Sequence, residues 1–166
     1  MSRKATVLSP QKAVYLAQHG RKGPVLLDMP MDIQRAQIEP EKLPSFFDSE
    51  EYMTLSRKES ITEKIEDVIR LLLLDKRPVI LVGGGIRSAN ASEALHELIQ
   101  KTTIPIVSSL MGLDAVAHDY QGFMGMIGSY GNRYSNLAVA NCDLLLVLGS
   151  RLDTRQTGTR PDTFAR

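Results

Sequence analysis

The sequence predicts an α/β protein in which helices cover both faces of a parallel β-sheet. Three short apolar runs, at 78–82, 104–107 and 143–148, lack the polar alternation of a strand that has one face in water. Helical segments lie between these runs, and strands that alternate with helices along a chain are typical of a parallel sheet. Apolar residues make up 43% of the 166 residues, which is enough for one domain with a buried core.

The first 30 residues predict one helix followed by one strand. Ser9 before Pro10 is typical of the start of a helix, and Gly20 is typical of its end. The apolar run at 24–29 predicts a short buried strand, because a proline follows it at once. Between 31 and 59 the apolar periodicity disappears, so we expect an extended linker there.

Helical periodicity returns at Ser60. Ser60 and Glu63 have the spacing of a capping box, and the apolar stripe that follows predicts a helix packed against the sheet. A second helix should begin at Asn90, with Glu93 three residues later, and a third should end at 137–142. Strands alternating with these helices predict a Rossmann-like layer.

The carboxyl ends of the strands are the expected ligand edge of such a sheet. Glycines at 83–85 suit either the close approach of a pyrophosphate or a tight turn, and the sequence leaves both open. The dinucleotide fingerprint is absent, because Ser88 stands where its third glycine belongs. Ser108 and Ser109 occupy the place of the acidic residue that holds the ribose of NAD. A nicotinamide-dependent dehydrogenase is therefore disfavoured.

A second group of candidate residues follows the last strand. Arg151, Asp153 and Arg155 alternate along the chain, so their side chains can point the same way. Guanidinium groups suit phosphate, and a carboxylate can accept from a ribose or an amide. A solvated charged loop is the alternative. We find no metal-ligand spacing and no motif of nucleophilic catalysis, and the three histidines are isolated.

Charge and composition exclude several classes of partner. Twenty basic and 19 acidic residues give a formal charge of +1, which provides no footprint for nucleic acid or an anionic membrane. Cys142 is the single cysteine, so an intrachain disulfide is impossible and a reducing cytoplasm fits best. No apolar run is long enough to span a membrane. The opening residues 1–4 lack a secretory signal, so we expect a cytoplasmic protein.

Five segments, in order, resemble the acetolactate synthases. The segment 20–34 is similar to the Gly-Arg-x-Gly-Pro-Val ending of that family's pyrimidine-binding domain, and 77–85 to the first strand of its central domain. The segments 110–113, 128–131 and 143–158 complete the series. Each motif is weak alone, but five in order identify the chain as similar to this family over about residues 11–160.

The resemblance implies a division of the chain. Residues 1–38 would be the C-terminal tail of the pyrimidine-binding domain, 39–60 a linker, and 61–166 a C-terminally truncated central domain of the FAD-binding type. Whole enzymes of this family use thiamine diphosphate and Mg²⁺. Neither the activating glutamate nor the Gly-Asp-Gly…Asn motif for these cofactors occurs in the 166 residues. We therefore assign no catalytic and no metal-binding residue, and expect the chain alone to be inactive.

The resemblance also implies a structural FAD on the central domain. The positions that match the family's FAD-binding motifs are Arg21, Gly83, Gly84, Gly85, Ser109, Leu110, Gly112, Gly128, Ser129, Arg151, Asp153 and Arg155. The sequence departs from the family at Met31, which replaces a lysine near the substrate channel. It departs again at Ser129 and Tyr130, which replace a Met-His pair. Relatives that carry no FAD remain an alternative.

The function implied by the resemblance is carboligation of 2-keto acids in branched-chain amino acid biosynthesis. The whole protein would be a transferase that condenses pyruvate-derived hydroxyethyl-thiamine with a second keto acid, as a homodimer or homotetramer. A flavin-linked pyruvate oxidase and a non-catalytic nucleotide-binding module are the alternatives. The Arg-x-Asp-x-Arg element favours the carboligase over the oxidase.

Overall fold

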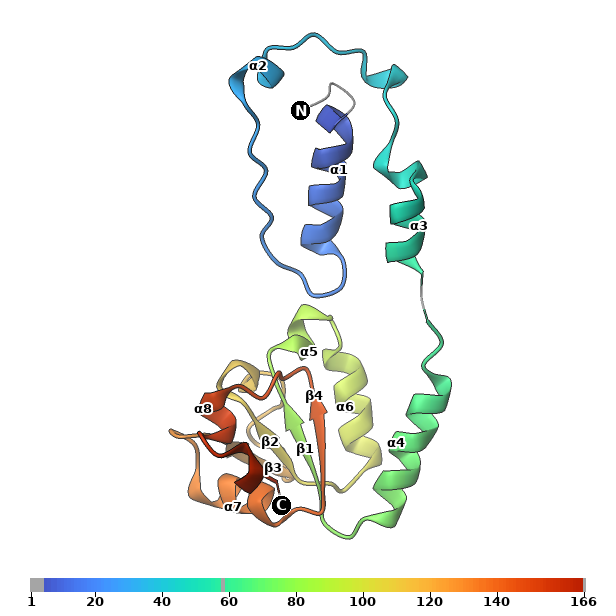
Figure 1. Cartoon of the computed structure of the whole chain (residues 1–166). Helices are drawn as coiled ribbons and strands as arrows, with labels where there is room; N and C mark the ends of the chain where they lie inside the picture. Colours follow the sequence, from blue (N-terminus) through green and yellow to red (C-terminus); the bar gives the residue numbers. More distant parts are fainter. Residues whose placement is uncertain (1–4, 58, 166) are drawn as a thin grey trace. The chain divides into compact units, whose positions relative to one another are not determined.

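The computed structural model describes residues 5–57 and 59–165, which form two compact units (Figure 1). Unit 1 ends at Ser60 and unit 2 begins at Ile61. The segment 1–4, on which the expectation about a secretory signal depends, lies outside the described residues. Within the described part of the chain, no helix is long and apolar enough to cross a membrane.

Unit 1 is a set of short helices around one aromatic cluster. Its elements are α1 (Ala5–Gln18), α2 (Met31–Gln34), the 3₁₀ turns η1 (Pro40–Lys42) and η2 (Phe46–Asp48), and α3 (Glu50–Ser56). The Phe46 ring is 2% exposed and packs against Tyr15 and Tyr52, with ring centroids 5.6 Å away in both pairs. The Gln11 side chain accepts a hydrogen bond from the Phe46 N–H at 2.8 Å, which joins α1 to η2.

Three expectations for this unit were wrong. The helix α1 contains Pro10 in its interior rather than beginning there. The segment 24–29 is not a strand, because no described strand pairs with it, and Leu26 is 93% exposed. The stretch 31–59 is not an extended linker: it holds four short helical elements, and Ser49 caps one of them by accepting from the Tyr52 N–H. Elements of three to seven residues are too short to produce a visible periodicity.

Unit 2 is a four-stranded parallel sheet with helices on both faces, as the sequence predicts (Figure 1). The strand order is β3-β2-β1-β4. The elements are α4 (Thr62–Leu74), β1 (Pro78–Val82), α5 (Gly85–Ser88), α6 (Ser92–Lys101), β2 (Ile106–Ser108), η3 (Leu110–Gly112), β3 (Phe123–Met126), α7 (Arg133–Asn141), β4 (Leu144–Leu148), α8 (Thr154–Thr157) and η4 (Pro161–Thr163).

The core of unit 2 lies on the two faces of the central strands. On one face Ile80 and Ile106, both 0% exposed, pack with Leu95 of α6. On the other face Leu81 packs with Val139 of α7. Successive residues of β1 are therefore buried on opposite faces of the sheet, and for this reason every residue of the strand is apolar.

Several details of unit 2 differ from the sequence expectations. The helix α4 begins one residue late, with Ile61 rather than Ser60 at the N-cap. Asn90 does not cap α6, whose N-cap is Ala91: its φ of 53° is left-handed, and it lies in the turn just after Ala89, the C-cap of α5. Asparagine tolerates that conformation better than most residues. The strand β3 was not foreseen, since it is short and its glycine, Gly125, weakens the signal of a strand.

The largest departure concerns the packing of α4. Its apolar stripe predicts close contact with the sheet, yet the helix has no buried residue. Ile65 is 48% exposed, Ile69 50% and Leu73 80%. The amphipathic pattern therefore predicted the helix correctly, but its apolar face lies largely uncovered.

Candidate functional site

The carboxyl ends of β1, β2 and β4 meet at one edge of the sheet, where their loops are joined backbone to backbone. The N–H of Gly83 donates to the carbonyl of Leu148 at 2.9 Å, and the N–H of Gly85 donates to the carbonyl of Gly149 at 2.9 Å. The N–H of Ser109 donates to the carbonyl of Val82 at 2.8 Å. The three loops therefore form one connected surface.

Glycine is required at this edge by the packing of the loops themselves. A Cβ atom on Gly83 would lie 2.4 Å from the carbonyl oxygen of Gly149, and one on Gly112 would lie 2.5 Å from that of Val82. On Gly85 it would lie 2.7 Å from the Cα of Gly149. Backbone atoms cannot move away from such a contact as easily as the end of a flexible side chain can. Loop packing accounts for these glycines without any ligand.

A fourth loop, between β3 and α7, reaches the same edge. Gly128 has a φ of +101°, and the Asn136 side chain both donates to its carbonyl and accepts from its N–H. The N–H of Ser129 donates to the carbonyl of Arg155 at 3.1 Å. This loop carries Tyr130, which is 91% exposed.

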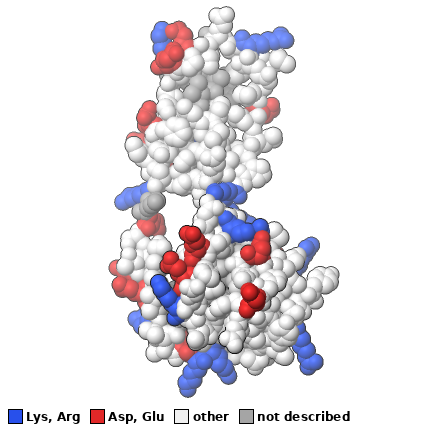
Figure 2. Space-filling model, turned by 180° about the vertical axis from the view of Figure 1, so that it is seen from behind, with Lys and Arg blue, Asp and Glu red and all other residues white. Residues whose placement is uncertain are grey.

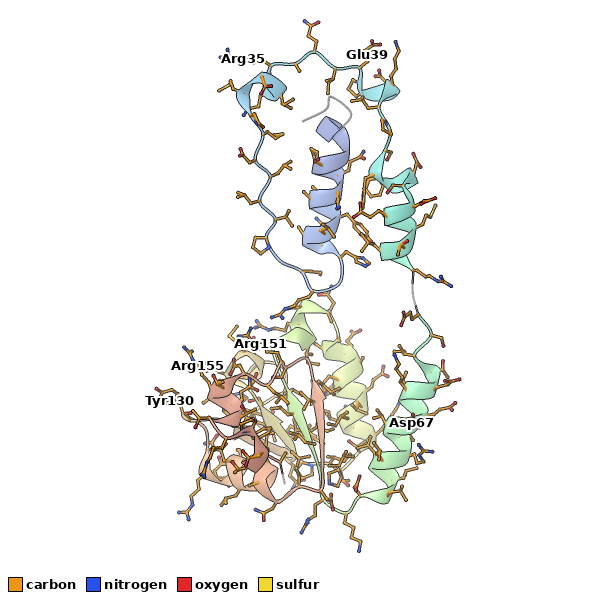
Figure 3. The ribbon with its side chains drawn as sticks, in the orientation of Figure 1. Arg35, Glu39, Asp67, Tyr130, Arg151 and Arg155 are labelled. Carbon is orange, nitrogen blue, oxygen red and sulfur yellow. The ribbon has the colours of Figure 1, made fainter. Side chains whose placement is uncertain are left out.

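The loop after β4 presents the arginines. Leu152 adopts a left-handed φ of 54°, which is costly for a leucine, while its side chain packs against the core. Asp153 caps α8 by accepting from the N–H of Arg155 at 3.1 Å. The Arg151 guanidinium is 70% exposed and lies 3.8 Å from the Asp153 carboxylate, a surface pair that contributes little stability. Figure 3 shows Arg151, Arg155 and Tyr130 on the same side of unit 2.

The structure thus brings most of the predicted site residues to one edge of unit 2. The residues that meet there are Gly83, Gly84, Gly85, Ser109, Leu110, Gly112, Gly128, Ser129, Arg151, Asp153 and Arg155. Arg21, the remaining predicted residue, belongs to unit 1. Sequence reasoning missed the roles of Gly149 and Asn136, whose only signal was their position beside the predicted strand and loop.

Two groups with perturbed pKa values lie away from this edge of the sheet. The carboxyl and thiol groups with perturbed pKa values, Asp143 and Cys142, lie where β4 begins. A cavity of about 450 Å³ lined by Lys76, Arg77 and Cys142 also lies there, at the opposite end of the strands. No group of three metal-ligating side chains occurs in the described ranges. Figure 2 shows basic and acidic side chains interspersed over the face of the molecule that is visible there.

Residues 65–166 match a family model described as the thiamine pyrophosphate enzyme central domain. The chain belongs to this family. It is 40% identical over 154 residues to the acetolactate synthase isozyme 2 large subunit of Escherichia coli K12, covering 93% of the chain. It is also 40% identical over 153 residues to the chloroplastic acetolactate synthase 1 of Zea mays, covering 89% of the chain.

A further relative, the acetolactate synthase large subunit of Cyanidium caldarium, is 33% identical over 171 aligned residues and covers 97% of the chain. The chain spans 27%, 23% and 27% of the length of these three relatives. The resemblance to acetolactate synthase large subunits is confirmed, and so is the α/β fold with a parallel sheet.

Proposed function

We propose that the chain is part of a thiamine-diphosphate-dependent carboligase of the acetolactate synthase kind. The observation that carries the proposal is the 40% identity to the Escherichia coli large subunit over 93% of the chain. In such an enzyme bound thiamine diphosphate supplies a stabilised carbanion. The reaction would condense the two-carbon unit of pyruvate with a second 2-keto acid, in branched-chain amino acid biosynthesis in the cytoplasm.

The part of this chain would be to hold a structural FAD along the carboxyl edge of unit 2. The fit rests on two observations: the loops are locked together by backbone hydrogen bonds, and Arg151 stands 70% exposed beside them. The guanidinium of Arg151 would pair with charged groups of the dinucleotide. The Asp153 carboxylate, 3.8 Å from the Arg151 guanidinium, would lie beside that contact.

No group of three His, Cys, Asp or Glu side chains in the described ranges could hold the Mg²⁺ that would accompany thiamine diphosphate. We infer that their ligands come from outside these 166 residues. The chain alone would then be inactive, and the whole protein would work as a homodimer or homotetramer. The domain limits at 38 and 60 are part of this proposal.

A chimaera tests the carboligase. The aligned segment of the Escherichia coli large subunit, 27% of that protein, is replaced by this chain, and acetolactate formed from pyruvate is measured. The proposal expects acetolactate as the main product. A folded, cofactor-loaded chimaera that releases acetate with reduction of an electron acceptor would favour the oxidase alternative, and one without either activity would contradict an enzymatic role.

A flavin titration tests the FAD site. Arg151→Ala should weaken FAD binding by about tenfold or more, since charge-assisted hydrogen bonds contribute about 1.5–3 kcal/mol. Arg70→Ala is a matched control, because Arg70 is 71% exposed and pairs with Asp67 as Arg151 pairs with Asp153. Equal affinities of the parent and both variants, or no binding below about 1 mM, would contradict the site.

A further inference from the structure

A cavity of about 450 Å³ lies at the amino ends of the strands in unit 2, at the opposite end of the sheet from the candidate FAD edge. The arrows of β1 and β4 in Figure 1 point away from this end. Its walls come from the turn before β1, the starts of β1 and β2, the strand β3 and the end of α7. All of its lining residues lie between positions 76 and 142, within the paired strands β1, β2 and β3 and the elements that flank them. Its volume is in the range of small-molecule sites, about 300–1,000 Å³.

The most buried of the residues that line the cavity are apolar. Val79 is 4% exposed and Cys142 is 2% exposed. Pro78 and Pro105 add ring carbons and have no N–H group to donate. The Cys142 thiol already donates to the carbonyl of Val139 at 3.1 Å, so its proton is not free for a ligand. This wall therefore suits the aliphatic part of a ligand.

The exposed residues that line the cavity are polar, and two of them are basic. They are Lys76, Arg77, Thr103 and Asn141. None of the described residues that line the cavity carries a carboxylate. An apolar wall combined with a few polar groups is the usual composition of a small-molecule site. Here the charged members of the polar set favour an anionic group on the ligand.

The backbone of the two basic residues is held by Asp143. The Asp143 carboxylate accepts from the N–H of Lys76 at 3.1 Å and from the N–H of Arg77 at 2.7 Å. It also lies 3.9 Å from the Arg77 Nε, so it offsets part of the positive charge of that side chain. The C-terminal end of α7 adds a partial negative charge of about half a unit. Lys76 forms no ion pair with a described residue, so its full charge is available to a ligand.

We propose that this cavity binds a small aliphatic carboxylate. The chain of the ligand lies against Val79, Pro105 and Cys142, and its carboxylate pairs with the charged groups of Lys76 and Arg77. A cavity of about 150 Å³ holds benzene. The larger volume here therefore has room for a chain of about eight carbons. The cavity shares no residue with the candidate FAD edge, so the inference is independent of the proposed function.

The test is a titration of the isotope-labelled 166-residue chain with sodium octanoate, followed by the NMR shifts of its backbone amides. We expect saturable shifts at Val79, Ile104 and Cys142, with a dissociation constant below about 1 mM. Octylammonium has the same aliphatic chain and the opposite charge. It should bind at least tenfold more weakly than octanoate, because it meets the two basic side chains.

A double variant tests the charged contact. Lys76→Ala with Arg77→Ala should weaken octanoate binding at least tenfold, because it removes both charges but keeps the N–H groups that bond Asp143. Arg70→Ala with Lys101→Ala is the matched control. It removes two basic side chains of unit 2 that are 71% and 77% exposed, and it should bind octanoate as the parent does.

A single variant tests the cavity itself. Thr103→Trp should abolish octanoate binding, because it places a large ring at an exposed position of the lining. A parent chain without saturable shifts at the cavity overturns the proposal, as do shifts confined to the apolar stripe of α4. Equal affinities for octanoate and octylammonium, or an unchanged affinity in the Lys76 and Arg77 double variant, would also overturn it. None of these outcomes depends on flavin or on carboligase activity.

Discussion

Replacing Gly83 by alanine separates two explanations of the glycines at the carboxyl edge. A Cβ there would lie 2.4 Å from the carbonyl oxygen of Gly149 and 2.8 Å from the Cα of Ser150. Relief of such overlap costs about 1–3 kcal/mol. The movement would also strain the hydrogen bonds that the N–H groups of Gly83 and Gly85 donate to the carbonyls of Leu148 and Gly149. Each of these hydrogen bonds contributes about 0.5–1.5 kcal/mol. We expect Gly83→Ala to lower the free energy of unfolding by about 3 kcal/mol.

Thermal unfolding followed by circular dichroism measures this loss. For a unit of this size, about 3 kcal/mol corresponds to a fall in Tm of about 10–20 °C. Gly23→Ala is the control, because a Cβ there would meet no atom within 4 Å. It should leave Tm unchanged or raise it slightly. A Gly83→Ala chain that melts within about 2 °C of the parent yet loses FAD binding would refute loop packing and favour clearance for a ligand.

Three further outcomes follow. Burial acts to raise the pKa of Asp143, but the N–H groups of Arg77 and Lys76 outweigh it and hold the pKa below the ordinary 3.8. Because its pKa is lowered in the folded state, the Asp143 carboxylate stabilises the fold above about pH 3.8, and this contribution is lost as the pH falls. In urea titrations, the Asp143→Asn variant should therefore be less stable than the parent at neutral pH, and its free energy of unfolding should fall less on acidification. Burial raises the pKa of the Cys142 thiol, which is 2% exposed, so a thiol reagent should label it only as fast as the chain unfolds; immediate labelling of the native chain would contradict the packing. The chain supplied with pyruvate, thiamine diphosphate and Mg²⁺ should form no acetolactate, and cofactor-dependent turnover would show that the catalytic groups lie within it.

Much of the candidate site could be predicted because it follows the strands directly in sequence. Once 78–82 and 143–148 are recognised as neighbouring parallel strands, the segments after them must meet at one edge. The partners of these segments could not be predicted. That Gly83 and Gly85 pack on Gly149, and that Asn136 holds Gly128, depends on strand order and on side-chain direction, which no local pattern records.

The sequence by itself determined the class of fold, since uninterrupted apolar strands between amphipathic helices are stable only in a covered parallel sheet. It did not determine which of these elements are covered by other parts of the protein. The run at 24–29 and the stripe of α4 have the composition of buried elements, yet Leu26 is 93% exposed and α4 buries no residue. An apolar periodic pattern shows that the side chains of a segment could be buried on one face. Whether another part of the protein covers that face depends on the tertiary structure, because burial requires a second apolar surface in contact with it.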